Sequence, residues 1–219
     1  MNEEKGLYPS CDEPTAENDY SFTWEELKRW DSRNGGIRRA KWHIVSALVD
    51  MIEEGESLEK ISIKEISKAA GISRQTFYNH FLDKYDAINW LRARIDEYTV
   101  DRIGVNLTWE QATKNRLEIM KHAPKFFTEV FRTEEFYEYA TNEAEIVHRY
   151  YEQNLRRLTG KELNETEQYL LKLYVEGSVR TTASWLKNDQ GKSPSFIVGV
   201  LGQALPDFVK KAYFGFYNQ

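Results

Sequence analysis

The chain has 219 residues and a formal net charge of −5, and 41% of its residues are hydrophobic. This length can bury a sizeable core, in one large domain or two small ones. The single cysteine, Cys11, excludes an intrachain disulfide and a cysteine-cluster metal site, which fits a reducing cytoplasm. The start of the chain lacks a signal-peptide pattern, and the longest apolar run is too short for a bilayer, so we expect a cytoplasmic protein without a membrane span.

The first part of the chain precedes the regular helical pattern. Residues 1–22 are polar and acidic and are predicted to form a disordered tail. Residues 23–36 are predicted to hold a short helix, opened by a Thr23–Glu26 capping box, and a linker ended by Asn34-Gly35-Gly36. This helix either lies on a nucleic-acid backbone or packs Trp24 and Trp30 against the body, and packing is favoured.

The central stretch runs from Ser62 to Lys84, after a helix expected over 37–54. Apolar residues at three- and four-residue spacing predict a helix that ends at Gly71, the residue best suited to leave a helix with positive φ. Ser73 can cap a second helix, in which Phe77 and Phe81 lie four apart and face inward together. Two helices joined by a tight glycine turn, with a polar outer face on the second, are typical of a helix-turn-helix.

The rest of the chain carries helical patterns and no strand pattern. Capping residues, Gly and Pro predict helices over 83–104, 108–121, 124–132, 134–158, 165–187 and 194–217. The expected fold is all-α, with an N-terminal three-helix helix-turn-helix DNA-binding domain over 37–88 and a C-terminal helical regulatory and dimerisation domain over 89–219.

Residues 37–88 resemble the DNA-binding domain of the tetracycline-repressor (TetR) family of transcriptional regulators. The resemblance rests on Ile63, Ile66, Ala70-Gly71-Ile72-Ser73, Thr76-Phe77-Tyr78, His80-Phe81 and Lys84. It implies a homodimer that binds a palindromic double-stranded operator and is released by a small-molecule effector. It also implies that Lys64, Arg74 and Gln75 face base edges, while Ser62, Thr76, Tyr78, His80 and Lys84 hold phosphates.

Side-chain chemistry supports this division independently. Arg74 can bind guanine in bidentate fashion, and Gln75 can do the same with adenine. Position 75 is often small in the family, so Gln75 either reads a base, pushes the helix outward or is merely solvated. The net acidity is compatible with DNA binding because basic residues gather at Arg33, Arg38, Arg39 and Lys41, with Lys64, Lys68, Arg74 and Lys84 beyond them.

The C-terminal half carries many aromatic residues that suit either an effector pocket or a packed core. The candidate pocket residues are Phe127, Phe131, Tyr137, His148, Tyr151 and Tyr174. The last two helices, over 164–187 and 194–217, are predicted to form the homodimer interface as a four-helix bundle, because glycines on them permit close approach.

Other kinds of site lack a supporting pattern. No zinc spacing, nucleophile motif, P-loop or dinucleotide loop is present, so no metal, cofactor or enzymatic activity is predicted. The favoured function is a ligand-released repressor. The alternatives are an effector-independent regulator whose C-terminal domain binds a protein partner, and a small helical enzyme or binding protein that uses the same fold.

Overall fold

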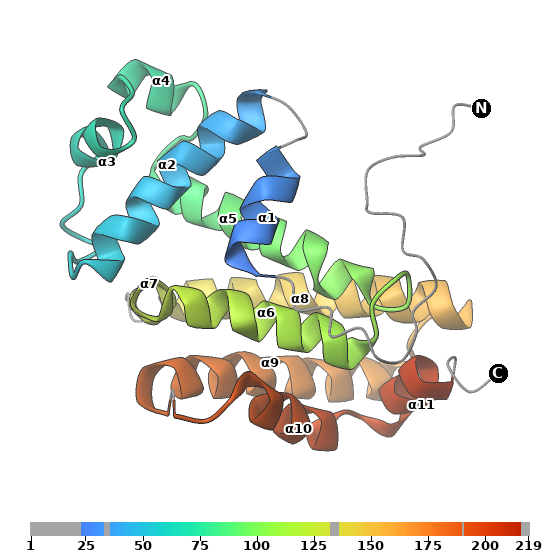
Figure 1. Ribbon diagram of the computed structural model, residues 1–219. Coiled ribbons are helices and arrows are strands. Elements are labelled where there is room, and N and C mark those ends of the chain that lie inside the picture. Colours follow the sequence, from blue (N-terminus) through green and yellow to red (C-terminus); the bar gives the residue numbers. More distant parts are fainter. Residues whose placement is uncertain (1–22, 33–35, 132–135, 190, 216–219) are drawn as a thin grey trace, which may run out of the picture.

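The computed structural model describes residues 23–32, 36–131, 136–189 and 191–215, so the predicted tail over 1–22 lies outside the described residues. Regular secondary structure in these ranges is helical, which confirms the all-α prediction (Figure 1). The helices are α1 (Trp24–Ser32), α2 (Gly36–Glu53), α3 (Ile63–Ala69), α4 (Arg74–Tyr78), α5 (Lys84–Tyr98), α6 (Trp109–His122), α7 (Pro124–Val130), α8 (Phe136–Thr159), α9 (Glu165–Asn188), α10 (Pro194–Ala204) and α11 (Asp207–Gly215).

Helices α2, α3 and α4 form a head at one end of the molecule (Figure 1). Phe77 of α4 and Phe81 are both buried, as the four-residue spacing predicts, and their ring centroids lie 6.0 Å apart. Phe81 also contacts Trp90 of α5, which in turn contacts the buried Trp42 of α2 at 5.3 Å. This aromatic cluster fixes α4 on α2 and α5, so its opposite face points outward.

Helix α1 packs on the body, as favoured from the sequence. Trp24 and Leu27 are buried, and the Trp24 ring lies 5.7 Å from Trp42 and stacks at 5.6 Å on His122 of α6. At its end the fully buried Asp31 carboxylate accepts hydrogen bonds from Arg38 at 2.5 Å and from the Trp42 indole at 2.8 Å. Helix α1 therefore contacts both the head and the rest of the helical body.

The body is layered, with α5 to α8 next to the head and α9 and α10 forming the layer farthest from α3 and α4 (Figure 1). Its buried polar contacts join distant segments. The Trp109 indole of α6 donates to the Tyr151 hydroxyl of α8 at 2.8 Å, and the Asn154 amide donates to the Val100 carbonyl at 2.7 Å. In the part of the chain that is described, no helix is long and apolar enough to cross a membrane.

Two expected helix ends are wrong. The helix expected over 194–217 is broken after Ala204, because Pro206 lacks an N–H and forces Leu205 into an extended conformation with ψ 132°. The helix expected over 83–104 ends at Tyr98 and is followed by a 3₁₀ turn, Val100–Arg102. Gly104 then adopts φ +74°, and a Cβ there would lie 2.8 Å from Leu158, so both backbone and space require glycine.

Candidate nucleic-acid interface

Local capping determines the shape of the α3–α4 unit. Ser62 and Glu65 form a reciprocal capping box at the start of α3, and Gly71 turns the chain with φ +68°. Ser73 then caps α4 by accepting the Thr76 N–H at 3.0 Å. Hydrogen bonds from the Ser62 hydroxyl and N–H hold the pKa of Glu65 below its ordinary value, so the box is present at neutral pH and is lost as pH falls through that lowered pKa.

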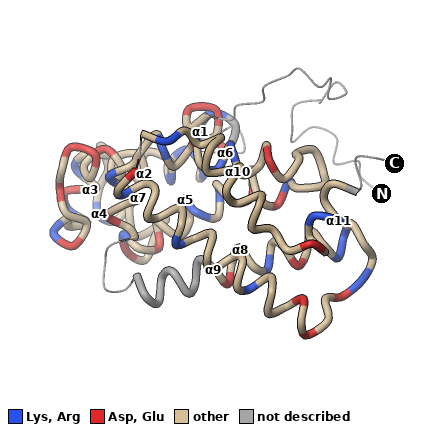
Figure 2. The backbone as a smooth tube through the Cα atoms, turned by 90° about the horizontal axis from the view of Figure 1, so that it is seen from below, with Lys and Arg blue, Asp and Glu red and all other residues tan. Residues whose placement is uncertain are grey.

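Three of the predicted contact residues stand outward on the recognition face. Arg74, Gln75 and Tyr78 of α4 are exposed, with the Tyr78 side chain 54% accessible. Lys64 is exposed on α3. Charges of both signs occur at this end of the molecule, so the face is basic only locally (Figure 2). Helix α4 therefore exposes hydrogen-bonding side chains, and their contact with a DNA groove stays a prediction.

The remaining predicted phosphate ligands are partly engaged within the head. The Ser62 hydroxyl donates to Glu65 at 2.7 Å, so its hydrogen is directed inward along α3. The Thr76 hydroxyl lies 2.9 Å from the Ser73 hydroxyl, and His80 is half-buried. Direct phosphate binding by Ser62 requires exchange of its hydrogen bond to Glu65.

Lys84 has a structural role that its position alone did not predict. Its ammonium donates to the carbonyl oxygens of Leu58, Glu59 and Ile61 at 2.6, 3.0 and 3.0 Å, which matches the number of hydrogens it carries. Lys84 thereby fastens the start of α5 to the loop before α3.

Two residues of the basic cluster that was expected to face DNA make contacts within the protein. Arg38 pairs with Asp31, and the Lys41 ammonium lies 4.6 Å from the centre of the Phe81 ring. The sequence pattern did not indicate these contacts, because Asp31 lies in a different helix from Arg38 and Phe81 is distant from Lys41 along the chain. Arg39, Lys64, Lys68 and Arg74 remain exposed.

Asn79 is a recognition-face residue that the sequence reasoning missed. It is exposed one helical turn after Gln75 and accepts a hydrogen bond from the Gln75 amide at 3.2 Å. The signal was available, because an amide pair at four-residue spacing on a helix is positioned to interact.

The predicted effector residues do not gather around one cavity. Tyr151 and Tyr174 line a cavity of about 40 Å³ between α6, α8 and α9, together with polar groups that include Arg116 and Thr182. Burial raises the pKa of both tyrosines above the ordinary value, so their hydroxyls stay protonated at neutral pH. Phe127 is buried against Phe126 with ring centroids 5.1 Å apart.

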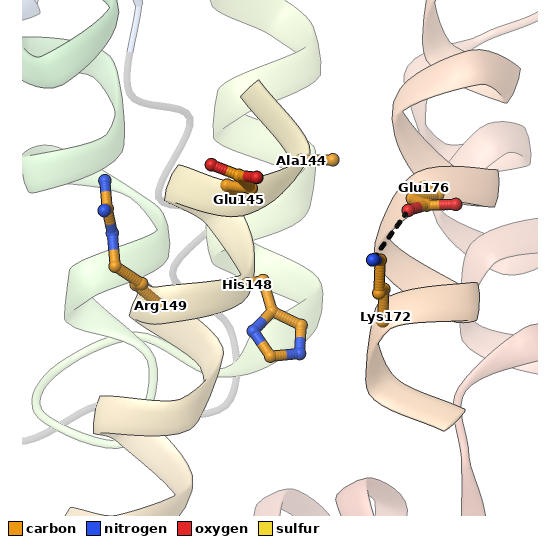
Figure 3. Close-up of a pocket in the computed structure, with 6 residues that line it drawn as sticks. All are labelled: Ala144, Glu145, His148, Arg149, Lys172 and Glu176. Carbon is orange, nitrogen blue, oxygen red and sulfur yellow. Dashed lines mark ion pairs between the residues drawn. The ribbon is translucent and has the colours of Figure 1, made fainter. Parts of the chain in front are cut away.

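The other predicted pocket residues lie elsewhere. Phe131 is half-buried at the end of α7, and the Tyr137 side chain lies outside the described residues. His148 lines a separate open pocket of about 340 Å³ between α8 and α9, where its imidazole is directed toward α9 (Figure 3). Glu145 and Arg149 of α8 and the Lys172–Glu176 pair of α9 complete the charged lining. Within the described residues, no group of at least three His, Cys, Asp or Glu side chains could hold a metal ion.

An exposed apolar face covers parts of α9 and α10. Its large members, with accessible fractions from 41% to 69%, are Tyr169, Leu170, Leu173, Phe196 and Val200. Leu171, Tyr174 and Val209, by contrast, are buried in the core. A set of exposed large hydrophobic side chains on two adjacent helices is typical of a protein interface.

The fold and this site define a helical regulator with a helix-turn-helix head. Residues 107–207 match a TetR-type family model described as a transcriptional regulator C-terminal region. By structure, the chain is similar to the dihydroxyacetone kinase operon activator DhaS, with a TM-score of 0.56, 14% identity, and coverage of 80% of this chain and 97% of that one. A TetR-family transcriptional regulator from Streptomyces coelicolor gives a TM-score of 0.54, 17% identity, and coverage of 78% and 80%.

Sequence relatives match a shorter part of the chain. The nucleoid occlusion factor SlmA of Vibrio campbellii is 30% identical over 86 residues, and that of Sodalis glossinidius is 28% identical over 83 residues. These matches cover 39% and 38% of this chain, and the chain spans only 44% and 42% of the length of these relatives. The C-terminal region of this protein is therefore similar to TetR-type transcriptional regulators.

Proposed function

We propose that this regulator binds a palindromic DNA operator as a homodimer, in the cytoplasm, and acts as a repressor without enzymatic activity of its own. The observation that carries the proposal is the outer face of α4, where Arg74, Gln75 and Tyr78 are exposed while Phe77 anchors the helix from behind. These side chains suit base edges and phosphates in a major groove.

The dimer in this proposal forms through the exposed face of α9 and α10. Pairing this face with its copy would bury Leu173 and Phe196, which are 69% and 50% accessible in the single chain. Helices α9 and α10 lie on the side of the body away from the head (Figure 1). A two-fold dimer would present two α4 helices to major grooves about 34–36 Å apart, or a multiple of that spacing.

The regulatory step in this proposal is a shift of the head relative to the body. Two contacts support a mechanical connection at Leu58, in the loop before α3. Its N–H donates to the Glu129 carboxylate of α7 at 3.2 Å, and its carbonyl accepts from Lys84 of α5 at 2.6 Å. A displacement of α7 or α5 would therefore act on the same loop and change the spacing of the two heads.

The trigger in this proposal is a small molecule that enlarges the cavity at Tyr151 and Tyr174. A second candidate is a protein partner bound by the C-terminal domain. The volume of about 40 Å³ at Tyr151 and Tyr174 favours it over an effector at these two residues, because ligand sites commonly occupy about 300–1,000 Å³. Release of operator DNA by the small-molecule fraction of a cell extract supports the first trigger. Release by the macromolecular fraction alone, lost after protease treatment, supports the second.

Replacement of Arg74 by alanine tests the DNA-binding proposal. We expect Arg74→Ala to relax sequence preference at one base pair in each half-site and to weaken operator binding by roughly tenfold per half-site, because one bidentate base contact is lost. The measurement is selection from a pool of randomised duplex DNA, followed by titration of the selected duplex and its single-base-pair variants.

Arg156→Ala is the matched control for Arg74→Ala. Arg156, in the last turn of α8, is 70% exposed and pairs with Glu162 in the connection between α8 and α9, so its loss removes the same charge away from the head. Equal effects of the two substitutions would show that Arg74 contributes only net charge. Unchanged DNA binding by Arg74→Ala would contradict its assignment as a base-reading residue.

A further inference from the structure

We propose that Asn79 is a positioning residue that orients Gln75 to read adenine in an A·T base pair. The inference rests on the proposed function and specifies part of its sequence readout. It starts from the hydrogen bond in which the Gln75 Nε2 donates to the Asn79 Oδ1 at 3.2 Å. Both side chains are exposed, Gln75 on α4 and Asn79 at the C-cap that follows it.

In the observed hydrogen bond the Gln75 amide adopts one of its two orientations, with Nε2 toward Asn79. A glutamine amide carries an acceptor oxygen and a donor nitrogen, and an isolated exposed side chain can present either one outward. The Asn79 Oδ1 is an acceptor, so it holds the Nε2 end toward the C-terminal end of α4. The Oε1 acceptor and the second Nε2 hydrogen remain directed away from this bond.

Adenine presents the complementary pair in the major groove. Its N6 amino group donates and its N7 accepts, which matches one oxygen and one hydrogen of a glutamine amide. Guanine presents two acceptors, O6 and N7, so the Gln75 oxygen would face an acceptor without a hydrogen between them. The oriented amide therefore discriminates adenine from guanine at the position that Gln75 reaches.

The arrangement of the rest of α4 supports this role. Phe77 is fully buried and Ser73 caps the helix, so the backbone that carries residues 75 and 79 is fixed before DNA binds. Arg74 and Tyr78 lie on the adjacent strip of the same face and are exposed. Because the amide pair is formed within the free protein, less side-chain freedom is lost when Gln75 meets a base.

The test compares three single variants in selection from randomised duplex DNA, followed by competition between duplexes that differ at one base pair. We expect the unaltered protein to prefer adenine over guanine by roughly tenfold at one position in each half-site, and Gln75→Ala to abolish that preference. Asn79→Ala is expected to reduce the preference at this same position to threefold or less. Because both residues are exposed, thermal melting should show that the variants fold.

Asn79→Asp separates positioning from a direct contact. A carboxylate at position 79 still accepts from the Gln75 amide, so the adenine preference should persist while the added negative charge lowers affinity for every duplex alike. The inference is overturned if Asn79→Ala leaves the preference intact, or if the base pair affected by Asn79→Ala differs from the one affected by Gln75→Ala. If the unaltered protein enriches no sequence at all, the proposed function itself is wrong.

Discussion

Leu173→Glu is expected to convert the protein into a monomer and to weaken binding to operator DNA by about 100-fold or more, because the two half-sites are then bound independently. Leu173 is 69% exposed on α9 and lies among the other large apolar side chains of the α9–α10 face. A carboxylate buried without a partner at the centre of a paired interface costs several kcal/mol. Sedimentation equilibrium and titration of a selected operator duplex measure the two effects.

Val105→Glu is the matched control for Leu173→Glu. Val105 is 53% exposed in the connection between α5 and α6, so the same kind of change occurs away from the α9–α10 face. The control should sediment as the unaltered protein does. A Leu173→Glu variant that still sediments as a dimer would show that the subunits pair through another surface.

Asp31→Ala is expected to lower the free energy of unfolding by about 3 kcal/mol, because it removes a fully buried carboxylate that accepts hydrogen bonds from Arg38 and the Trp42 indole. Its carboxylate is fully buried and bonds to Arg38 and to the Trp42 indole, and the Tyr98 hydroxyl lies 3.5 Å away. Loss of the carboxylate leaves the Trp42 N–H without its acceptor. Urea denaturation monitored by tryptophan fluorescence and circular dichroism measures the change.

Two further variants separate the contributions at this position. Asp31→Asn keeps an oxygen that can accept from the Trp42 indole but lacks the charge opposite Arg38, so its loss of stability should be smaller. Glu25→Ala, an exposed acid on the same helix, should change stability by no more than about 0.5 kcal/mol. If Asp31→Ala unfolds at the same urea concentration as the unaltered protein, the Asp31 carboxylate does not stabilise the contact between α1 and the head.

The sequence predicted those parts of the fold that depend on local signals. The predicted caps Thr23 and Ser73 placed the starts of two helices correctly, because each cap bonds within three residues of itself. Gly71 likewise turns the chain through its own backbone conformation. The helix break at Pro206 was equally local and was overlooked, since the apolar period runs on through it.

Several predicted site residues make contacts with parts of the chain that are distant in sequence, and residue spacing does not predict such contacts. Lys84 meets carbonyl groups more than 20 residues away, so its engagement in the head could not be deduced from its family position. Similarly, the aromatic residues of the body were recognised, but which of them share a cavity depends on how α6, α8 and α9 pack. Tyr151 and Tyr174 meet there, whereas Phe127 faces a separate part of the core.

The position of α1 has a consequence for building chimeric regulators. A head excised at the start of α2 would lose Asp31 while keeping Arg38 and Trp42, the two residues that bond to it. A head transplanted onto a foreign body would also lose the stacking of Trp24 on His122 of α6. The segment to be exchanged should therefore begin at Trp24, ahead of the helix-turn-helix. The recipient body also needs an aromatic side chain at the position that His122 occupies at the end of α6, so that Trp24 can stack on it.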